Sequence, residues 1–182
     1  TCGVKVPNSF AITSEAYWLY IKENKLTNKL KKILENLDIK DMKSLEEKGL
    51  KIRTLILNGK LPKILEDEIL QAYKKLSKQY KNKSIDVAIR SSATAEDLPN
   101  ASFAGQQDSF LNVRGDKEIL KYVKKCFASL FTNRAISYRQ SRGFEHFKVA
   151  LSVGIQKMVK SDNASSGIMF TLDTENGCED IV

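Results

Sequence analysis

Cysteine, histidine and long apolar runs are scarce in this chain of 182 residues, and each scarcity excludes a class of protein. No run of about eighteen apolar residues occurs, so no membrane-spanning helix is predicted. The three cysteines, Cys2, Cys126 and Cys178, are widely spaced and form no CxxC pair. This pattern indicates reduced thiols in a cytoplasmic protein and argues against a disulfide framework or a zinc site.

The familiar signatures of phosphate binding and catalysis are also missing. Neither GxxxxGK[ST] nor GxGxxG occurs, which excludes the P-loop and Rossmann routes to a phosphate. The single histidine, His146, is flanked by Phe144 and Phe147, so a packed side chain explains it better than a general base or a phosphocarrier. Glu96 and Asp97 are adjacent in a loop and point different ways. We therefore predict no catalytic residue and no metal ligand in this chain.

The net charge of +8 comes entirely from the first part of the sequence. Residues 1–83 carry 18 basic and 10 acidic side chains, whereas residues 84–182 carry 12 of each. The lysines fall between apolar positions of expected helices, as on solvated helix faces. Aromatic interleaving and the motifs of helix-turn-helix or RRM domains are missing, so we predict no nucleic-acid partner. A basic interaction module remains an alternative.

Apolar periodicity divides the chain into a helix-rich part, residues 1–84, and a strand-containing part, residues 85–182. In the first part we expect an edge strand within 4–12 and helices over 14–24, 30–37, 44–58 and 62–79. A capping box formed by Ser44 and Glu47 would open the third helix. In the second part we expect strands over 85–90, 108–113, 149–159, 166–171 and at 181–182, and helices over 116–131 and 133–141. This order predicts an α+β or mixed α/β fold.

The segment from Val87 to Val113 has the composition of a phosphate site. Its strand presents Arg90 on the face opposite Val87 and Ile89, and a run of small and hydroxylated residues follows around Gly105. Arginine offers a fixed fork of donors, and glycine lets backbone N–H groups approach an anion. The strand over 149–159 adds a second face of small residues, Ser152 and Gly154 among them, against which something flat could lie.

Three segments carry a resemblance to a known family: VAIRSSATAEDLPNASFAGQQDSFLNV, FASLFTNRAISYR and LSVGIQKMVKSDNASSGIMFTLDTENG. They resemble the nucleotide-binding domain shared by phosphoenolpyruvate synthase, pyruvate phosphate dikinase and rifampin phosphotransferase. The similarity extends over nearly the whole chain, from GVKVPNSFAITSEAY onward. It implies an ATP-grasp-like nucleotide-binding domain that is incomplete here. In this family ATP phosphorylates a histidine on a separate swivelling domain, which carries the group to the acceptor.

The resemblance also implies roles for single residues. Arg90 matches an arginine that contacts the nucleotide phosphates, and Gly105 and Ser109 match positions in the loop folded over them. Gln156 matches a residue at the adenine hinge, with the Met158 backbone nearby. The family's glycine-rich lysine segment would lie before Thr1. Its metal-binding carboxylate, phosphohistidine and pyruvate-binding segments would lie after Val182, so Mg²⁺ ligands are expected outside this chain.

The function implied is the ATP-binding portion of a phosphoenolpyruvate synthase-like dikinase, acting on pyruvate through the missing domains. The resemblance implies that the full-length protein is a cytoplasmic, homodimeric phosphotransferase. Two alternatives stay open: the nucleotide domain of a rifampin-type antibiotic phosphotransferase and a non-catalytic basic interaction module. Alone, the fragment is expected to be inactive, because phosphoryl transfer depends on cations placed around the reacting group.

Overall fold

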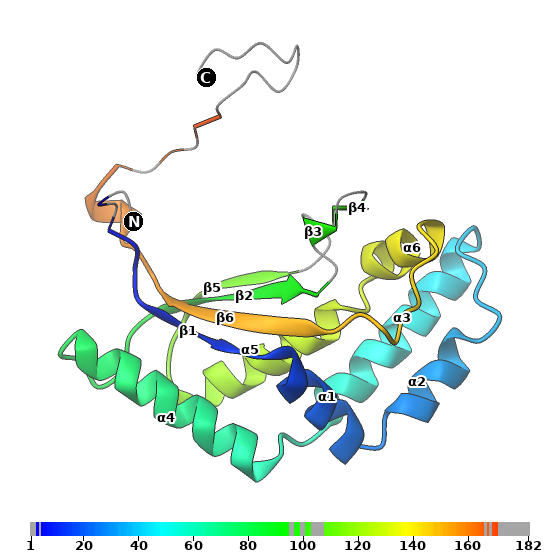
Figure 1. Cartoon of the computed structure of the whole chain (residues 1–182), viewed down its shortest axis with the longest axis horizontal. Coiled ribbons are helices and arrows are strands. Elements are labelled where there is room, and N and C mark those ends of the chain that lie inside the picture. The colour runs from blue at the N-terminus through cyan, green and yellow to red at the C-terminus, as the bar shows by residue number, and fades with distance from the viewer. Residues whose placement is uncertain are drawn as a thin grey trace.

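The computed structural model describes residues 3, 5–94, 97–98, 101–102, 108–165, 167 and 169–170, with only the backbone at 97–98 and 101–102. Helices fill most of the first half of this region, and the second half contains both strands and helices (Figure 1). In chain order the elements are β1 Ser9–Ile12, α1 Ser14–Glu23, α2 Thr27–Leu34, α3 Met42–Asn58, α4 Lys63–Gln79, β2 Val87–Ala93, β3 Asp97–Leu98, β4 Ala101–Ser102, β5 Ser109–Val113, α5 Asp116–Ser129, α6 Asn133–Ser141, β6 Leu151–Lys157 and a 3₁₀ turn, Ser161–Asn163.

The main sheet has four strands in the order β1-β6-β2-β5, and every neighbouring pair is antiparallel. Strands β3 and β4 form a separate antiparallel pair. The prediction of a chain that mixes helices with strands is confirmed. Strand β1 comes from residues 1–84 yet pairs with β6 of residues 85–182, so the sheet joins the two predicted parts. The division at residues 84 and 85 stays a prediction.

Helices cover one face of the sheet and leave the other face uncovered by any helix of the described region (Figure 1). Helix α5 packs against β2, β5 and β6, α1 packs against β6, and α4 packs against β1. Alternation of side chains along each strand explains the asymmetry, because every second residue faces the helices. The inward residues of the sheet are fully or almost fully buried: Ile12, Val87, Ile89, Val113, Leu151, Val153 and Ile155.

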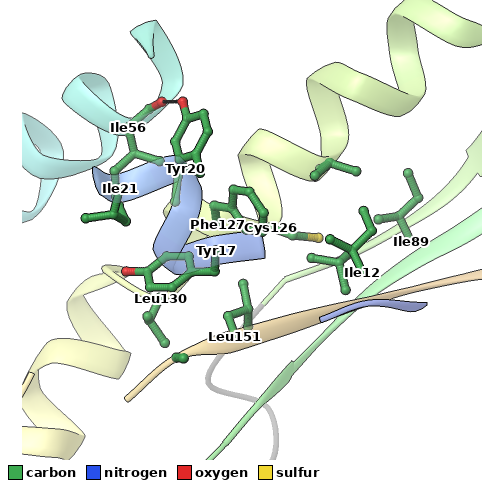
Figure 2. Close-up of a cluster of buried hydrophobic side chains, with 14 of the residues drawn as sticks. Ile12, Tyr17, Tyr20, Ile21, Ile56, Ile89, Cys126, Phe127, Leu130 and Leu151 are labelled. Atoms are coloured by element: carbon green, nitrogen blue, oxygen red, sulfur yellow. Dashed lines mark hydrogen bonds between the residues drawn. The ribbon is translucent and has the colours of Figure 1, made fainter. Parts of the chain in front are cut away.

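The core between sheet and helices is built around Phe127 of α5. Its ring lies 5.5 Å from that of Tyr17 and 5.3 Å from that of Tyr20, measured between centroids. Figure 2 shows Tyr17 and Phe127 above the inward side chains of the sheet, with the Tyr20 hydroxyl donating a hydrogen bond to the Ile56 carbonyl of α3. Aromatic rings that bury this much area dominate core energetics. The polar bond ties α1 to α3 without leaving a buried hydroxyl unpaired.

The predicted start of one helix needs correction. Helix α3 begins at Met42, because the Asp41 carboxylate accepts a hydrogen bond from the Ser44 N–H at 3.1 Å and caps the helix there. The proposed capping box of Ser44 and Glu47 is therefore wrong. Aspartate caps as well as serine does, and the earlier candidate prevails. Thr13 precedes the first helix residue of α1, and Gly115, with φ of 90°, precedes that of α5.

Two of the predicted strands cannot be compared with the structure. The strands expected over 166–171 and at 181–182 lie largely or wholly outside the described residues. Strand β6 is shorter than the expected 149–159, whereas α6 has the bounds expected for it. Within the described part of the chain, no helix has both the length and the apolar character that crossing a bilayer requires.

Candidate functional site

The uncovered face of the sheet brings several of the predicted site residues into register. Arg90 of β2 lies opposite Ser109 of β5 on one side and Gly154 of β6 on the other. Gly154 in turn lies opposite Ala11 of β1. Directly opposed residues point to the same face of a sheet, with Cβ atoms about 4.5–5.5 Å apart. One row across all four strands therefore reads Ala11, Gly154, Arg90, Ser109, and we call it the arginine row.

A second row runs parallel to the first, two residues further along β6. It consists of Ser9, Gln156 and Ala88, on β1, β6 and β2. Apart from Gln156, its members are small. Sequence reasoning singled out the small face of β6 but missed that β1 extends it. The signal was present, since Ser9 and Ala11 are small residues at the two-residue spacing of one strand face.

Arg90 is the exposed cation of this face. Its side chain makes no hydrogen bond or ion pair with any residue that the structure describes, and Gly154 beside it leaves the guanidinium room to lie along the sheet. The nearest heavy atom to a Cβ built at Gly154 is the Arg90 carbonyl oxygen, at 3.8 Å. The position is therefore open above the backbone. Arg90 is placed to meet an anion there, and its contact with nucleotide phosphate stays a prediction.

The residues predicted at the adenine hinge are already engaged with the protein. The Gln156 amide nitrogen donates a long hydrogen bond of 3.4 Å to the Pro7 carbonyl. The Met158 N–H donates to the Asp86 carbonyl at 2.9 Å, and the Met158 carbonyl accepts from Lys157 Nζ at 2.6 Å. The Met158 N–H is thus unavailable to a base in this arrangement. The side-chain amide oxygen of Gln156 can still accept a hydrogen bond. The hinge role of both residues stays a prediction.

The hydroxyl groups near Arg90 divide into bound and exposed. Thr94 exchanges hydrogen bonds with the Ala150 backbone, its Oγ1 accepting from Ala150 N–H at 3.1 Å. The Ser91 hydroxyl donates to the Asp108 carbonyl at 3.3 Å. Both serve the loop that follows β2, whereas Ser92 and Ser109 are exposed. Gly105 lies outside the described residues, as do Glu96 and the side chain of Ser102.

His146 is half-buried, and its expected role as a packed side chain stays a prediction. Its Nδ1 accepts a hydrogen bond from Arg139 Nε at 3.0 Å. Burial, and then the charge of Arg139, lower the pKa of His146 from 6.5 to about 4. Arg139 itself is completely buried, and its guanidinium lies 5.4 Å from the centre of the Phe131 ring. Its two terminal nitrogens have no hydrogen-bond partner among the described residues. No sequence pattern singled out this arginine.

A metal site does not assemble in the described part of the chain, where no three His, Cys, Asp or Glu side chains come together as one ion would require. What does assemble, among the described residues, is a row of mostly small side chains across the sheet that contains the exposed cation Arg90. Such a surface suits a ligand that is planar at one end and anionic at the other.

Comparison with known proteins identifies the family. Residues 1–182 match the family described as the pyruvate phosphate dikinase AMP/ATP-binding domain. The chain belongs to this family. The resemblance drawn from the three sequence segments is thereby confirmed.

Close relatives of this AMP/ATP-binding domain are phosphoenolpyruvate synthases. The one from Helicobacter pylori is 57% identical over 180 residues, which are 99% of this chain and 22% of that protein. The one from Aquifex aeolicus is 54% identical over 180 residues, 99% of this chain and 21% of that protein. The one from Escherichia coli is 48% identical, with 99% and 22% covered. The chain thus spans about a fifth of the length of these relatives.

Proposed function

We propose that this chain supplies part of the ATP site of a phosphoenolpyruvate synthase-like dikinase, with ATP lying across the open face of the sheet. The arginine row is the observation that carries the proposal. In this row the exposed Arg90 lies between Gly154 and Ser109, on strands held in register by backbone hydrogen bonds. Family membership supports a nucleotide as the ligand, and the arginine row supports its proposed position on this face.

In this arrangement each part of the face has a separate task. Arg90 binds phosphate oxygens through its fork of donors, and such charge-assisted bonds are roughly twice as strong as neutral ones. The small residues Ala11 and Gly154 let the planar part of the nucleotide approach the sheet. The buried face beneath, packed on α1 and α5, keeps the strands rigid, which positioning of a reactive group requires.

The full reaction would join ATP, pyruvate and water to give AMP, phosphoenolpyruvate and phosphate, through a phosphohistidine outside this chain. An ATP-grasp-like fold agrees with a sheet that has one free face, which would be completed by further structure. Magnesium bound with ATP would neutralise charge on the phosphates, and its ligands are expected outside the described residues. A cytoplasmic location and a homodimeric full-length protein belong to the same proposal.

A chimera tests the proposal directly. The Helicobacter pylori phosphoenolpyruvate synthase would have its matching 180 residues replaced by this chain, at 57% identity. We expect the purified chimera to form AMP from ATP in sustained turnover only when pyruvate is present, because pyruvate is needed to free the phosphohistidine for the next cycle. The same chimera with Arg90→Ala should remain folded and lose most of this activity. A folded chimera that neither binds ATP nor forms AMP would refute the proposal. Equal activity with and without Arg90 would remove that residue from the site.

A further inference from the structure

The helical side of the molecule carries a groove between α2 and α3 that the proposed ATP site does not use. Its volume is about 490 Å³, within the range of ligand-binding clefts. Lysines form its rim and half-buried aliphatic side chains form its floor. The lining residues are Lys29, Lys32 and Ile33 of α2 and Lys48, Lys51 and Leu55 of α3, and we call this site the lysine groove.

The lysines of this groove have no acidic partner. None of them takes part in an ion pair within the described residues, and α2 contains no carboxylate. Lys48 Nζ donates only to the backbone carbonyl of Glu35, at 2.9 Å. On α4 the pattern differs, because Lys63 pairs with Asp67 at 2.8 Å. The groove therefore concentrates part of the basic surplus of residues 1–83 without neutralising it.

We propose that the lysine groove docks an acidic segment of protein that carries aliphatic side chains. The lysine ammonium groups, which form no ion pair with the described residues, attract carboxylates. Complementary charge of this kind raises the association rate and favours a matching partner. Ile33 and Leu55, each only partly buried, call for aliphatic side chains from the same occupant. An amphipathic acidic segment laid between two helices satisfies both demands, in the way that helices dock into grooves.

The lining residues favour a protein over other polyanions. Single-stranded nucleic acid gains much of its affinity from bases stacked on aromatic side chains, and no aromatic residue lines this groove. A small phosphate would prefer an arginine fork or backbone N–H groups, and the rim offers neither. Helices α2 and α3, which carry the lining residues, belong to the helical side of the molecule and not to the open face of the sheet (Figure 1). An occupant could therefore bind here whether or not the proposed ATP site is correct.

The test uses this 182-residue chain and a short fluorescein-labelled peptide made of Glu and Leu. A groove variant and a matched control each lose the same charge. The groove variant combines Lys29→Gln, Lys32→Gln, Lys48→Gln and Lys51→Gln. The control changes exposed lysines of α4 and the following turn that form no described ion pair, Lys75→Gln, Lys78→Gln, Lys81→Gln and Lys83→Gln. Two further peptides, one of Gln and Leu and one of Glu and Ser, remove the charge or the aliphatic groups in turn.

We expect the Glu and Leu peptide to bind, and the groove variant to bind it roughly tenfold more weakly, since each exposed pair contributes little but the variant removes all of them. The control should change affinity less than twofold, and both altered peptides should bind more weakly than the first. Thermal unfolding of both variants should match that of the parent. Equal losses in groove variant and control would overturn the proposal, because net charge alone would then explain binding. Failure of the peptide to bind, or tighter binding of a single-stranded oligonucleotide at the groove, would overturn it as well.

Discussion

Replacing Gly154 by valine is the sharpest perturbation of the open sheet face. Gly154 lies in the middle of β6, between Ala11 and Arg90, with an extended backbone that any residue can adopt. A Cβ there would meet only the Arg90 carbonyl oxygen, at an ordinary contact distance of 3.8 Å. Glycine destabilises the interior of a strand, whereas valine has a high strand propensity. We therefore expect the free energy of unfolding to rise by about 0.5–1 kcal/mol.

The same substitution should damage ATP binding. The added methyl groups stand on the face where we place the nucleotide, and forcing a ligand against them should cost about 1–3 kcal/mol, as overpacking does in cores. Affinity should therefore fall roughly tenfold or more, since about 1.4 kcal/mol corresponds to a factor of ten. Gly154→Ala should give a smaller loss, and Thr54→Val, on the exposed side of α3, should give none. The assay is ATP titration beside thermal unfolding. Undiminished ATP binding in a stable Gly154→Val variant would refute the placement of ATP on this face.

Three further predictions concern other parts of the chain. Arg90→Ala should weaken ATP binding about ten- to a hundredfold, and Arg90→Lys should recover only part of it, because lysine lacks the fork of donors; full recovery in a titration would contradict a bidentate contact. Gly59→Ala should lower the free energy of unfolding by roughly 1–3 kcal/mol, measured with denaturant. The new methyl group would clash with the Tyr20 hydroxyl and lie 2.9 Å from the Tyr20 ring carbon Cζ. Unchanged stability would show that Tyr20 can move. His146→Asn should flatten the loss of stability in acid. Since the folded-state pKa of His146 is about 4 against 6.5 ordinarily, the unfolded chain binds the proton first, and stability falls as pH drops from 6.5 towards 4. We expect roughly 1–2 kcal/mol of that loss, discounted for partial exposure, to vanish in the variant when melting is followed against pH; identical pH profiles would refute the assignment.

Local patterns predicted much of this fold. The helix over 133–141 and the strands around Val87, Ser109 and Val153 follow from periodicity and turn residues. Helix starts were less secure, because Asp41 and Ser44 are both good caps and their sequence context does not rank them. Nothing local could place β1 beside β6, since that pairing joins residues about 145 apart and depends on the whole core.

The site was predictable in its chemistry and not in its geometry. Arg90 and the small face of β6 were recognisable from residue type and strand alternation. Their alignment with Ser109 and Ala11 depends on the register of three strand pairs, which only the assembled sheet defines. The burial of Arg139 could not be anticipated either, because arginine is almost never fully buried and no nearby carboxylate in the sequence suggested a partner.

The most direct test of the central claim is a nuclear magnetic resonance titration of the isotope-labelled chain with ATP at millimolar concentration. This method detects even weak binding, which suits a chain that spans about a fifth of the length of its relatives. The account predicts the largest amide shifts at Arg90, Ser109, Gly154 and Gln156, with the residues of α2 and α3 unchanged. Shifts confined to the helical side, or no shift at any concentration of ATP, would contradict it.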